Sequence, residues 1–104
     1  MRLVTLIYEE TKMFPDDEKF GLISQMRRCA VSVPSNIAEG WGRMSRKNYI
    51  QFLRISRGSL FELETQLLIT KELKYSNNSE TIESLIIEVS KMLNALIYKL
   101  EEKA

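Results

Sequence analysis

The sequence contains few side chains that could catalyse a reaction. It has no histidine and one cysteine, Cys29, which excludes imidazole catalysis and histidine-bound metals. Cys29 has no base near it in the sequence, so a small residue beside the core is the better interpretation. Glu39 lacks a second acid nearby and can instead pair with Arg43 one helical turn later. We therefore predict no enzyme activity, no catalytic residue, no cofactor, no metal and no small-molecule substrate.

The basic residues are the side chains whose number and spacing could bind a ligand. The net charge is only +1, but eight basic residues and one acid lie between residues 19 and 57, and the rest of the chain is acidic. Such a segment is typical of a phosphate-binding surface, so we predict one exterior basic zone that binds nucleic acid, with RNA favoured. The alternative is a solvated face, or pairing with acids of the fourth helix in a neighbouring subunit. The predicted nucleic-acid-binding residues are Arg27, Arg28, Arg43, Arg46, Lys47, Arg54 and Arg57.

Several other side chains have two interpretations. Ser32 and Asn36 could contact a nucleic-acid backbone or base, or they could hydrogen-bond between helices or across a subunit contact. Trp41 could stack on a base, but its helical phase with apolar residues favours packing in the core. Gly58 and Ser59 indicate a close approach between two helices. The choice in each case depends on where the neighbouring helices lie.

Pro34 lies inside a helical pattern that defines the second helix. Apolar residues recur at steps of three and four, and the pattern keeps its phase across Pro34. It predicts one helix from about residue 17 to residue 40, kinked near Pro34, with Gly40 and Gly42 ending it. The alternative is a break at Val33, with Pro34 in the first turn of a new helix. The apolar face comprises Phe20, Ile23, Met26, Ala30, Val33, Ile37 and Trp41.

The other predicted helices are also amphipathic. Residues 3–11 form a short first helix, and Asp16 or Asp17 caps the second. Ser45 caps the third helix, and the fourth follows a loop at residues 75–79. The third helix carries a heptad seam of Tyr49, Leu53, Ser56, Leu60, Leu63, Leu67 and Thr70. The fourth carries a seam of Ile82, Leu85, Ile86, Val89, Met92, Leu93, Leu96 and Leu100.

The pattern as a whole predicts an all-α protein. Four amphipathic helices with short connections predict a single domain, residues 1–104, folded as an antiparallel up-down four-helix bundle. A second stripe on the third helix indicates a further neighbour, which could belong to another chain. No apolar run is long enough for a membrane span, no signal peptide is visible, and the single cysteine agrees with a reducing cytoplasm. The second stripe comprises Ile50, Arg54, Arg57, Phe61 and Leu68.

Two sequence blocks resemble a known family. Residues 25–40, QMRRCAVSVPSNIAEG, resemble the signature of the bacterial four-helix-bundle proteins encoded in 23S rRNA intervening sequences, also called S23 ribosomal proteins. Residues 52–64, FLRISRGSLFELE, are similar to the second block of that family. The turn at Phe14 and Pro15, and Glu18, also match. Family members usually have a longer first helix than the one predicted here.

The resemblance implies an assembly and a set of partners. It implies a closed homo-oligomer, a pentameric ring, associated with rRNA. Similarity to the accessory protein of diversity-generating retroelements implies a reverse transcriptase or its template as a partner. The alternative function is therefore a structural adaptor ring that recruits a protein, with its arginines used for assembly. The residues that we assign to structure or to the oligomer interface are Ser32, Pro34, Asn36, Glu39, Gly40, Ile50, Phe61 and Leu68.

Overall fold

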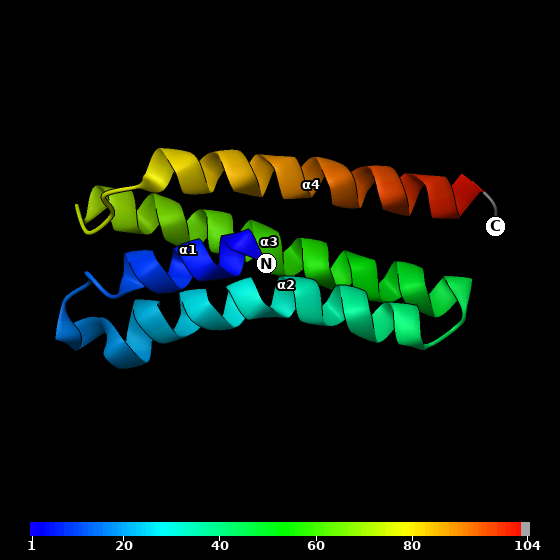
Figure 1. Cartoon of the computed structure of the whole chain (residues 1–104), viewed down its shortest axis with the longest axis horizontal. Coiled ribbons are helices and arrows are strands. Elements are labelled where there is room, and N and C mark those ends of the chain that lie inside the picture. The colour runs from blue at the N-terminus through cyan, green and yellow to red at the C-terminus, as the bar shows by residue number, and fades with distance from the viewer. Residues whose placement is uncertain (103–104) are drawn as a thin grey trace.

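The computed structural model describes residues 1–102, in which four α-helices and no strand occur. The helices are α1 (Arg2–Thr11), α2 (Ser24–Gly42), α3 (Arg46–Glu72) and α4 (Ser79–Glu102) (Figure 1). A 3-10 turn, η1 (Asp16–Glu18), and a π-helical turn, η2 (Lys19–Ile23), connect α1 to α2. The prediction of an all-α fold is confirmed.

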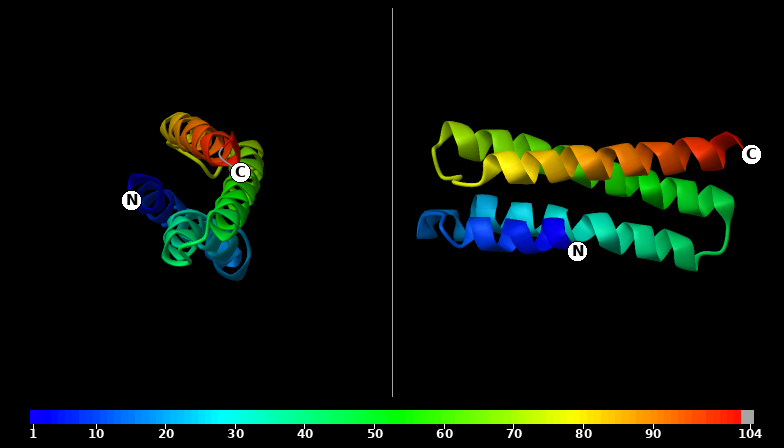
Figure 2. Two further views of the ribbon diagram at one scale, coloured as in Figure 1. Left: turned by 90° about the vertical axis from the view of Figure 1, so that its right-hand side faces the viewer. Right: turned by 45° about the horizontal axis from the view of Figure 1, so that its top comes forward.

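The helices form an antiparallel up-down bundle in which α1 is much shorter than the others. In the end-on view of Figure 2, α1 lies between α2 and α4, opposite α3. The body measures 46 × 23 × 18 Å, and the N-terminus lies near the middle of its long axis (Figure 1). The bundle therefore has four helices in one half of its length and three in the other half.

The core follows the predicted seams closely. On α3 every seam residue from Leu53 to Thr70 is buried, and Tyr49 at its start is half-buried. On α4 the seam is confirmed except at Met92, which is exposed. Ile97, outside the predicted seam, is buried and belongs to the core. The core residues contributed by α2 and α4 are Met26, Cys29, Ala30, Val33, Ile82, Ile86, Leu93 and Ile97.

A single helix runs through Pro34, so the alternative of a break at Val33 is wrong. α2 is bowed near its middle in Figure 1. The proline has no N–H for the carbonyl of Ala30, and a bend at such a position is the usual result. Beside it the Ser56 hydroxyl of α3 donates to the Val33 carbonyl over 2.8 Å, which ties the bent segment to the neighbouring helix.

The start and the end of α2 differ from the prediction. Gly21 has non-helical dihedral angles (φ −107°, ψ −111°), so the regular helix begins at Ser24 and not near residue 17. The predicted cap, Asp16 or Asp17, is replaced by Glu18, whose carboxylate accepts the Leu22 N–H over 3.5 Å. The helix ends at Gly42, but the left-handed residue after it is Met44 (φ 56°), not a glycine.

The close approach between helices occurs at Gly40 and not at Gly58. A Cβ atom on Gly40 would lie 2.6 Å from the Cβ of Phe52, whereas one on Gly58 would meet nothing within 4 Å. The predicted cap of α3 is confirmed, since the Ser45 hydroxyl accepts the Asn48 N–H over 3.4 Å. Gly40 thus serves helix packing, and Ser45 starts the next helix.

Two aromatic residues assigned to the core of α2 are exposed instead. Phe20 is 89% exposed because it lies in η2, where the kink at Gly21 shifts it out of phase with α2. Trp41 is 72% exposed although its phase is correct, because α1 does not extend far enough to cover it. The prediction that both pack in the core is wrong.

Candidate nucleic-acid interface

Polar side chains join α2 to α3 over the half of their contact that lies away from the connecting turn. The hydroxyl groups of Ser32 and Ser59 hydrogen-bond over 2.8 Å, and the Asn36 amide donates to the Ser32 carbonyl and hydroxyl, each over 2.8 Å. Toward the start of α2, the Gln66 amide donates to the Gln25 side chain over 3.5 Å. Of the two interpretations of Ser32, the structure shows the hydrogen bond between helices. Asn36 supports that contact from within α2.

Cys29 belongs to this same row of contacts. Its thiol donates a hydrogen bond to Oε2 of Glu62 over 2.8 Å. Burial, together with the hydrogen bond and negative charge of Glu62, raises the pKa of the Cys29 thiol to about 11. The thiol is therefore protonated at neutral pH and is a poor nucleophile, as the structural interpretation requires.

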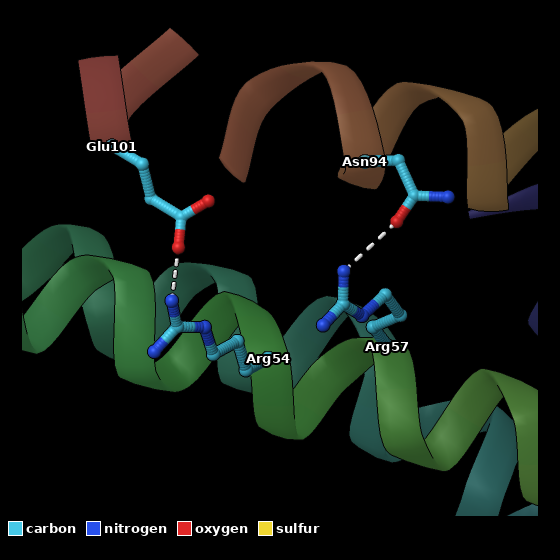
Figure 3. Close-up of polar contacts among 4 residues, drawn as sticks. All are labelled: Arg54, Arg57, Asn94 and Glu101. Atoms are coloured by element: carbon cyan, nitrogen blue, oxygen red, sulfur yellow. Dashed lines mark hydrogen bonds and ion pairs between the residues drawn. The ribbon is translucent and has the colours of Figure 1, made fainter. Parts of the chain in front are cut away.

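Several of the predicted nucleic-acid-binding arginines have partners within the chain. Arg54 pairs with Glu101 of α4, and Arg57 donates to Oδ1 of Asn94 over 3.0 Å (Figure 3). Arg43 pairs with Glu39 over 2.7 Å, as predicted. These pairs are roughly half exposed, so water and salt screen them, and each is worth about 1 kcal/mol or less. The acid that Arg54 meets lies in the same subunit, not in a neighbour.

One basic surface lies between α1 and α2, and we name it the α1–α2 groove. It has a volume of about 660 Å³. Arg27 is held in place there, because its Nε donates to the Thr11 hydroxyl over 2.8 Å and its guanidinium lies 4.6 Å from the Tyr8 ring centroid. The groove is lined by Tyr8, Lys19, Phe20, Ile23, Ser24, Arg27, Arg28, Val31 and Ser32.

A second basic surface lies where α3 begins and α4 ends, and we name it the α3 hollow. It has a volume of about 760 Å³. Glu101 is its one acidic lining residue among those that the structure describes, and that carboxylate is paired with Arg54. The hollow is lined by Arg46, Lys47, Asn48, Ile50, Gln51, Arg54 and Glu101.

Five of the seven predicted basic residues line two separate surfaces, and Arg43 and Arg57 line neither, so the predicted residues do not form one zone. In the α2–α3 hairpin, residues at equal distances from the turn lie opposite each other, as the contacts Cys29–Glu62 and Ser32–Ser59 show. Arg28 thus lies opposite residue 63, about 25 Å along the bundle from Arg46 at 1.5 Å per residue. The basic residues around Arg28 and those around Arg46 are close in sequence, but the α2–α3 hairpin places them toward opposite ends of the bundle.

Sequence reasoning did not assign Lys19 and Phe20 to the binding set, although it did consider Trp41 as a residue that could stack on a base. Lys19 and Phe20 line the α1–α2 groove but were absent from the predicted set. The signal available was Gly21, which follows Phe20 directly and can interrupt a helix. At the other end, Trp41 lies edge-on to Tyr49 with ring centroids 5.6 Å apart, beside a third hollow of about 470 Å³.

Three residues of α3 that were assigned to structure or to the oligomer interface differ in their burial. Ile50 is buried in the core of its own chain, whereas Phe61 and Leu68 on α3 are half exposed. Within residues 1–102, no three acidic, histidine or cysteine side chains are grouped as metal ligands would be. None of the helices that the structure describes combines the length and the apolar character that crossing a bilayer requires.

A comparison with models of protein families gives a match. A family described as 23S rRNA-intervening sequence protein matches residues 1–95. That range includes α1, α2, α3 and most of α4, and therefore both basic surfaces except for Glu101. A comparison with curated proteins found no match.

Proposed function

The chain belongs to the 23S rRNA-intervening sequence protein family, and from that membership we propose that it is a non-enzymatic protein that binds RNA. The observation that carries the proposal is the pair of basic surfaces, the α1–α2 groove and the α3 hollow. Polyanions bind such surfaces through phosphate contacts and the release of counterions. The family description supports rRNA as the class of target.

Within these surfaces, Arg28 and Lys47 are the cations best placed to meet phosphates. Neither forms an ion pair with another residue in the part of the chain that the structure describes. Arg54, in contrast, must exchange its carboxylate partner for a phosphate, as must Arg43, which lies outside both surfaces and pairs with Glu39. The two surfaces lie about 25 Å apart, so an RNA segment that touches both must be at least that long.

The test is binding of a labelled 23S rRNA transcript at increasing salt. We expect the affinity to fall steeply with salt, with a slope that reports the number of phosphates contacted. The double variant Arg28→Glu/Lys47→Glu should bind about tenfold or more weakly and show a shallower slope. The matched control is Lys91→Glu, a charge reversal on the exposed side of α4, away from both surfaces. Binding that neither salt nor the double variant weakens contradicts the proposal.

The second candidate function is a structural adaptor built from several copies of the chain, for which the family resemblance implies a pentamer. A row of exposed apolar side chains supports it. The contacts Lys71–Glu83 and Arg54–Glu101 set the register of α3 against α4 and place Leu68 opposite Ile87. Phe61 lies two turns from Leu68 on the same face of α3, and all three side chains are about half exposed. Such a row is an association surface, and the ring it builds would recruit a protein such as a reverse transcriptase.

Light scattering tests the adaptor candidate through the molar mass in solution. We expect a mass of several subunits for the wild type, and dissociation in the double variant Phe61→Glu/Leu68→Glu. The control is Ile55→Glu, an exposed residue on a different face of α3. A monomeric wild type contradicts assembly. Recruitment through this apolar row should resist salt, which separates it from phosphate binding.

A further inference from the structure

We infer that the α1–α2 groove binds an unpaired RNA base, with Phe20 as the surface on which the base stacks. This inference rests on the proposed RNA binding and names the kind of RNA that one of the two surfaces accepts. It depends on three features of the groove: an exposed aromatic ring, three cations that share the groove with it, and a wall that a planar ring can enter.

Phe20 is the feature that ordinary packing does not explain. Its side chain is 89% exposed, and it is held in η2, which projects it away from the core. The backbone kinks at the next residue, Gly21, and this kink separates the phase of Phe20 from the core face of α2. A phenylalanine ring presented in this way is a stacking platform for a nucleobase, because every base has a π face.

Three cations share the groove with this ring. The ammonium group of Lys19 lies 5.7 Å from the Phe20 ring centroid, and Arg27 and Arg28 line the same groove. No acidic side chain is among the described residues that line it. The combination of an aromatic platform and unopposed positive charge fits a base with a phosphate on either side of it.

The wall of the groove suits a planar ligand. Tyr8, Ile23 and Val31 provide its apolar surface, and Ser24 adds a hydroxyl group. Arg27 is already fixed across the Tyr8 ring, so this wall does not need to be ordered when a ligand enters. A volume of about 660 Å³ lies within the range of small-ligand sites.

An unpaired base fits these features better than a duplex. In an RNA duplex each base is already stacked on both faces. It can therefore gain stacking energy from Phe20 only after it has left the duplex stack. A duplex would meet the cations alone. The groove should therefore distinguish single-stranded from double-stranded RNA. The α3 hollow should not, because no aromatic residue is among the described residues that line it.

The experiment compares two labelled probes of equal length, a single-stranded oligouridylate and an RNA duplex. Phe20→Ala should weaken binding of the oligouridylate on the order of tenfold and change binding of the duplex less than twofold. Phe20→Trp should keep or improve the binding of the oligouridylate. Both substitutions are at an exposed position, so the fold is retained, which circular dichroism checks.

Met92→Ala serves as the matched control, since it removes an exposed apolar side chain far from the groove. Arg28→Gln separates charge from stacking: it should lower the salt slope by about one for both probes. If Phe20→Ala binds the oligouridylate as tightly as the wild type does, the stacking site is overturned and RNA binding stands. If the wild type binds neither probe, both proposals are contradicted.

Discussion

At the scale of single residues, two buried polar groups hold separate elements of the bundle together through hydrogen bonds. Cys29 is the one thiol in the chain, and its S–H is committed to the Glu62 carboxylate. Glu10 is only 7% exposed, and its Oε1 accepts from the Ser76 hydroxyl over 3.0 Å and from the Asn78 N–H over 3.2 Å. Each group joins two elements that are far apart in sequence.

Cys29 should react slowly with thiol reagents in the folded protein. Its pKa is raised from an ordinary value of 9.0 to about 11, so near pH 8 the thiolate fraction is about a hundredfold lower than in the unfolded chain. Because the folded pKa is the higher one, the stabilisation is complete below pH 9 and is lost as the pH rises toward 11.

The measurements are the rate of alkylation at pH 8, with and without denaturant, and urea unfolding across pH 8–11. Cys29→Ala should lose less stability over this pH range than the wild type does. Rapid alkylation of the folded protein at pH 8 contradicts the hydrogen bond to Glu62.

Glu10→Ala should destabilise the protein by about 1–3 kcal/mol. The substitution removes the buried carboxylate that accepts from the Ser76 hydroxyl and the Asn78 N–H in a partly buried contact with the α3–α4 loop. The midpoint of urea denaturation measures the loss. Glu9→Ala is the control, since Glu9 is exposed and its loss should change stability by no more than about 0.5 kcal/mol. Equal effects of the two variants would show that the Glu10 contacts contribute nothing.

At the scale of elements, the α2–α3 hairpin is held in one register by several independent contacts. Its heptad seam, its row of polar contacts and the close approach at Gly40 all obey one antiparallel register. Two of the three glycines in this unit have opposite roles. Gly40 faces the side chain of Phe52, whereas Gly58 faces open space.

Gly40→Ala and Gly58→Ala should therefore change stability in opposite directions. The Cβ at residue 40 would meet Phe52 at 2.6 Å and force the helices apart, which costs about 1–3 kcal/mol. The Cβ at residue 58 meets nothing, and alanine stabilises a helix interior by about 0.5–1 kcal/mol relative to glycine. Thermal unfolding of the pair is the measurement. A lower melting temperature for Gly58→Ala would indicate that another subunit packs against residue 58.

At the scale of the whole molecule, the short α1 decides which surfaces are open. It covers one half of the space between α2 and α4 and leaves the other half uncovered. Trp41 lies in the uncovered half and is 72% exposed in the single chain. Its fluorescence therefore reports whether another molecule covers that half.

In the monomer, Trp41 should emit at the long wavelengths of a solvated indole and should be quenched readily by iodide. The tryptophan is unique in the chain, so the signal has one source. If the half of the bundle that α1 leaves uncovered faces water in an oligomer, diluting the protein until the oligomer dissociates should leave the Trp41 emission unchanged. An emission at short wavelength that shifts on dilution would show that a second copy covers Trp41.

The sequence allowed the four helices and most of the core to be predicted, because the spacing of apolar residues is a local property of the chain. The seam of α3 from Leu53 to Thr70 was predicted correctly for this reason. The start of α2 was not, because the kink at Gly21 shifts the phase of Phe20, and one glycine inside an apolar pattern does not decide whether the helix is interrupted there. For the candidate site, the basic side chains were found but their grouping was not.

Tertiary structure alone decided what each helix face meets. Pattern placed Trp41 on the core face of its helix, and only the length of α1 left that face uncovered. Pattern placed Arg28 and Arg46 in one basic segment, and only the register of the hairpin moved them about 25 Å apart. The physical reason is that periodicity reports how a helix would bury one side, whereas burial and charge clustering depend on partners distant in sequence.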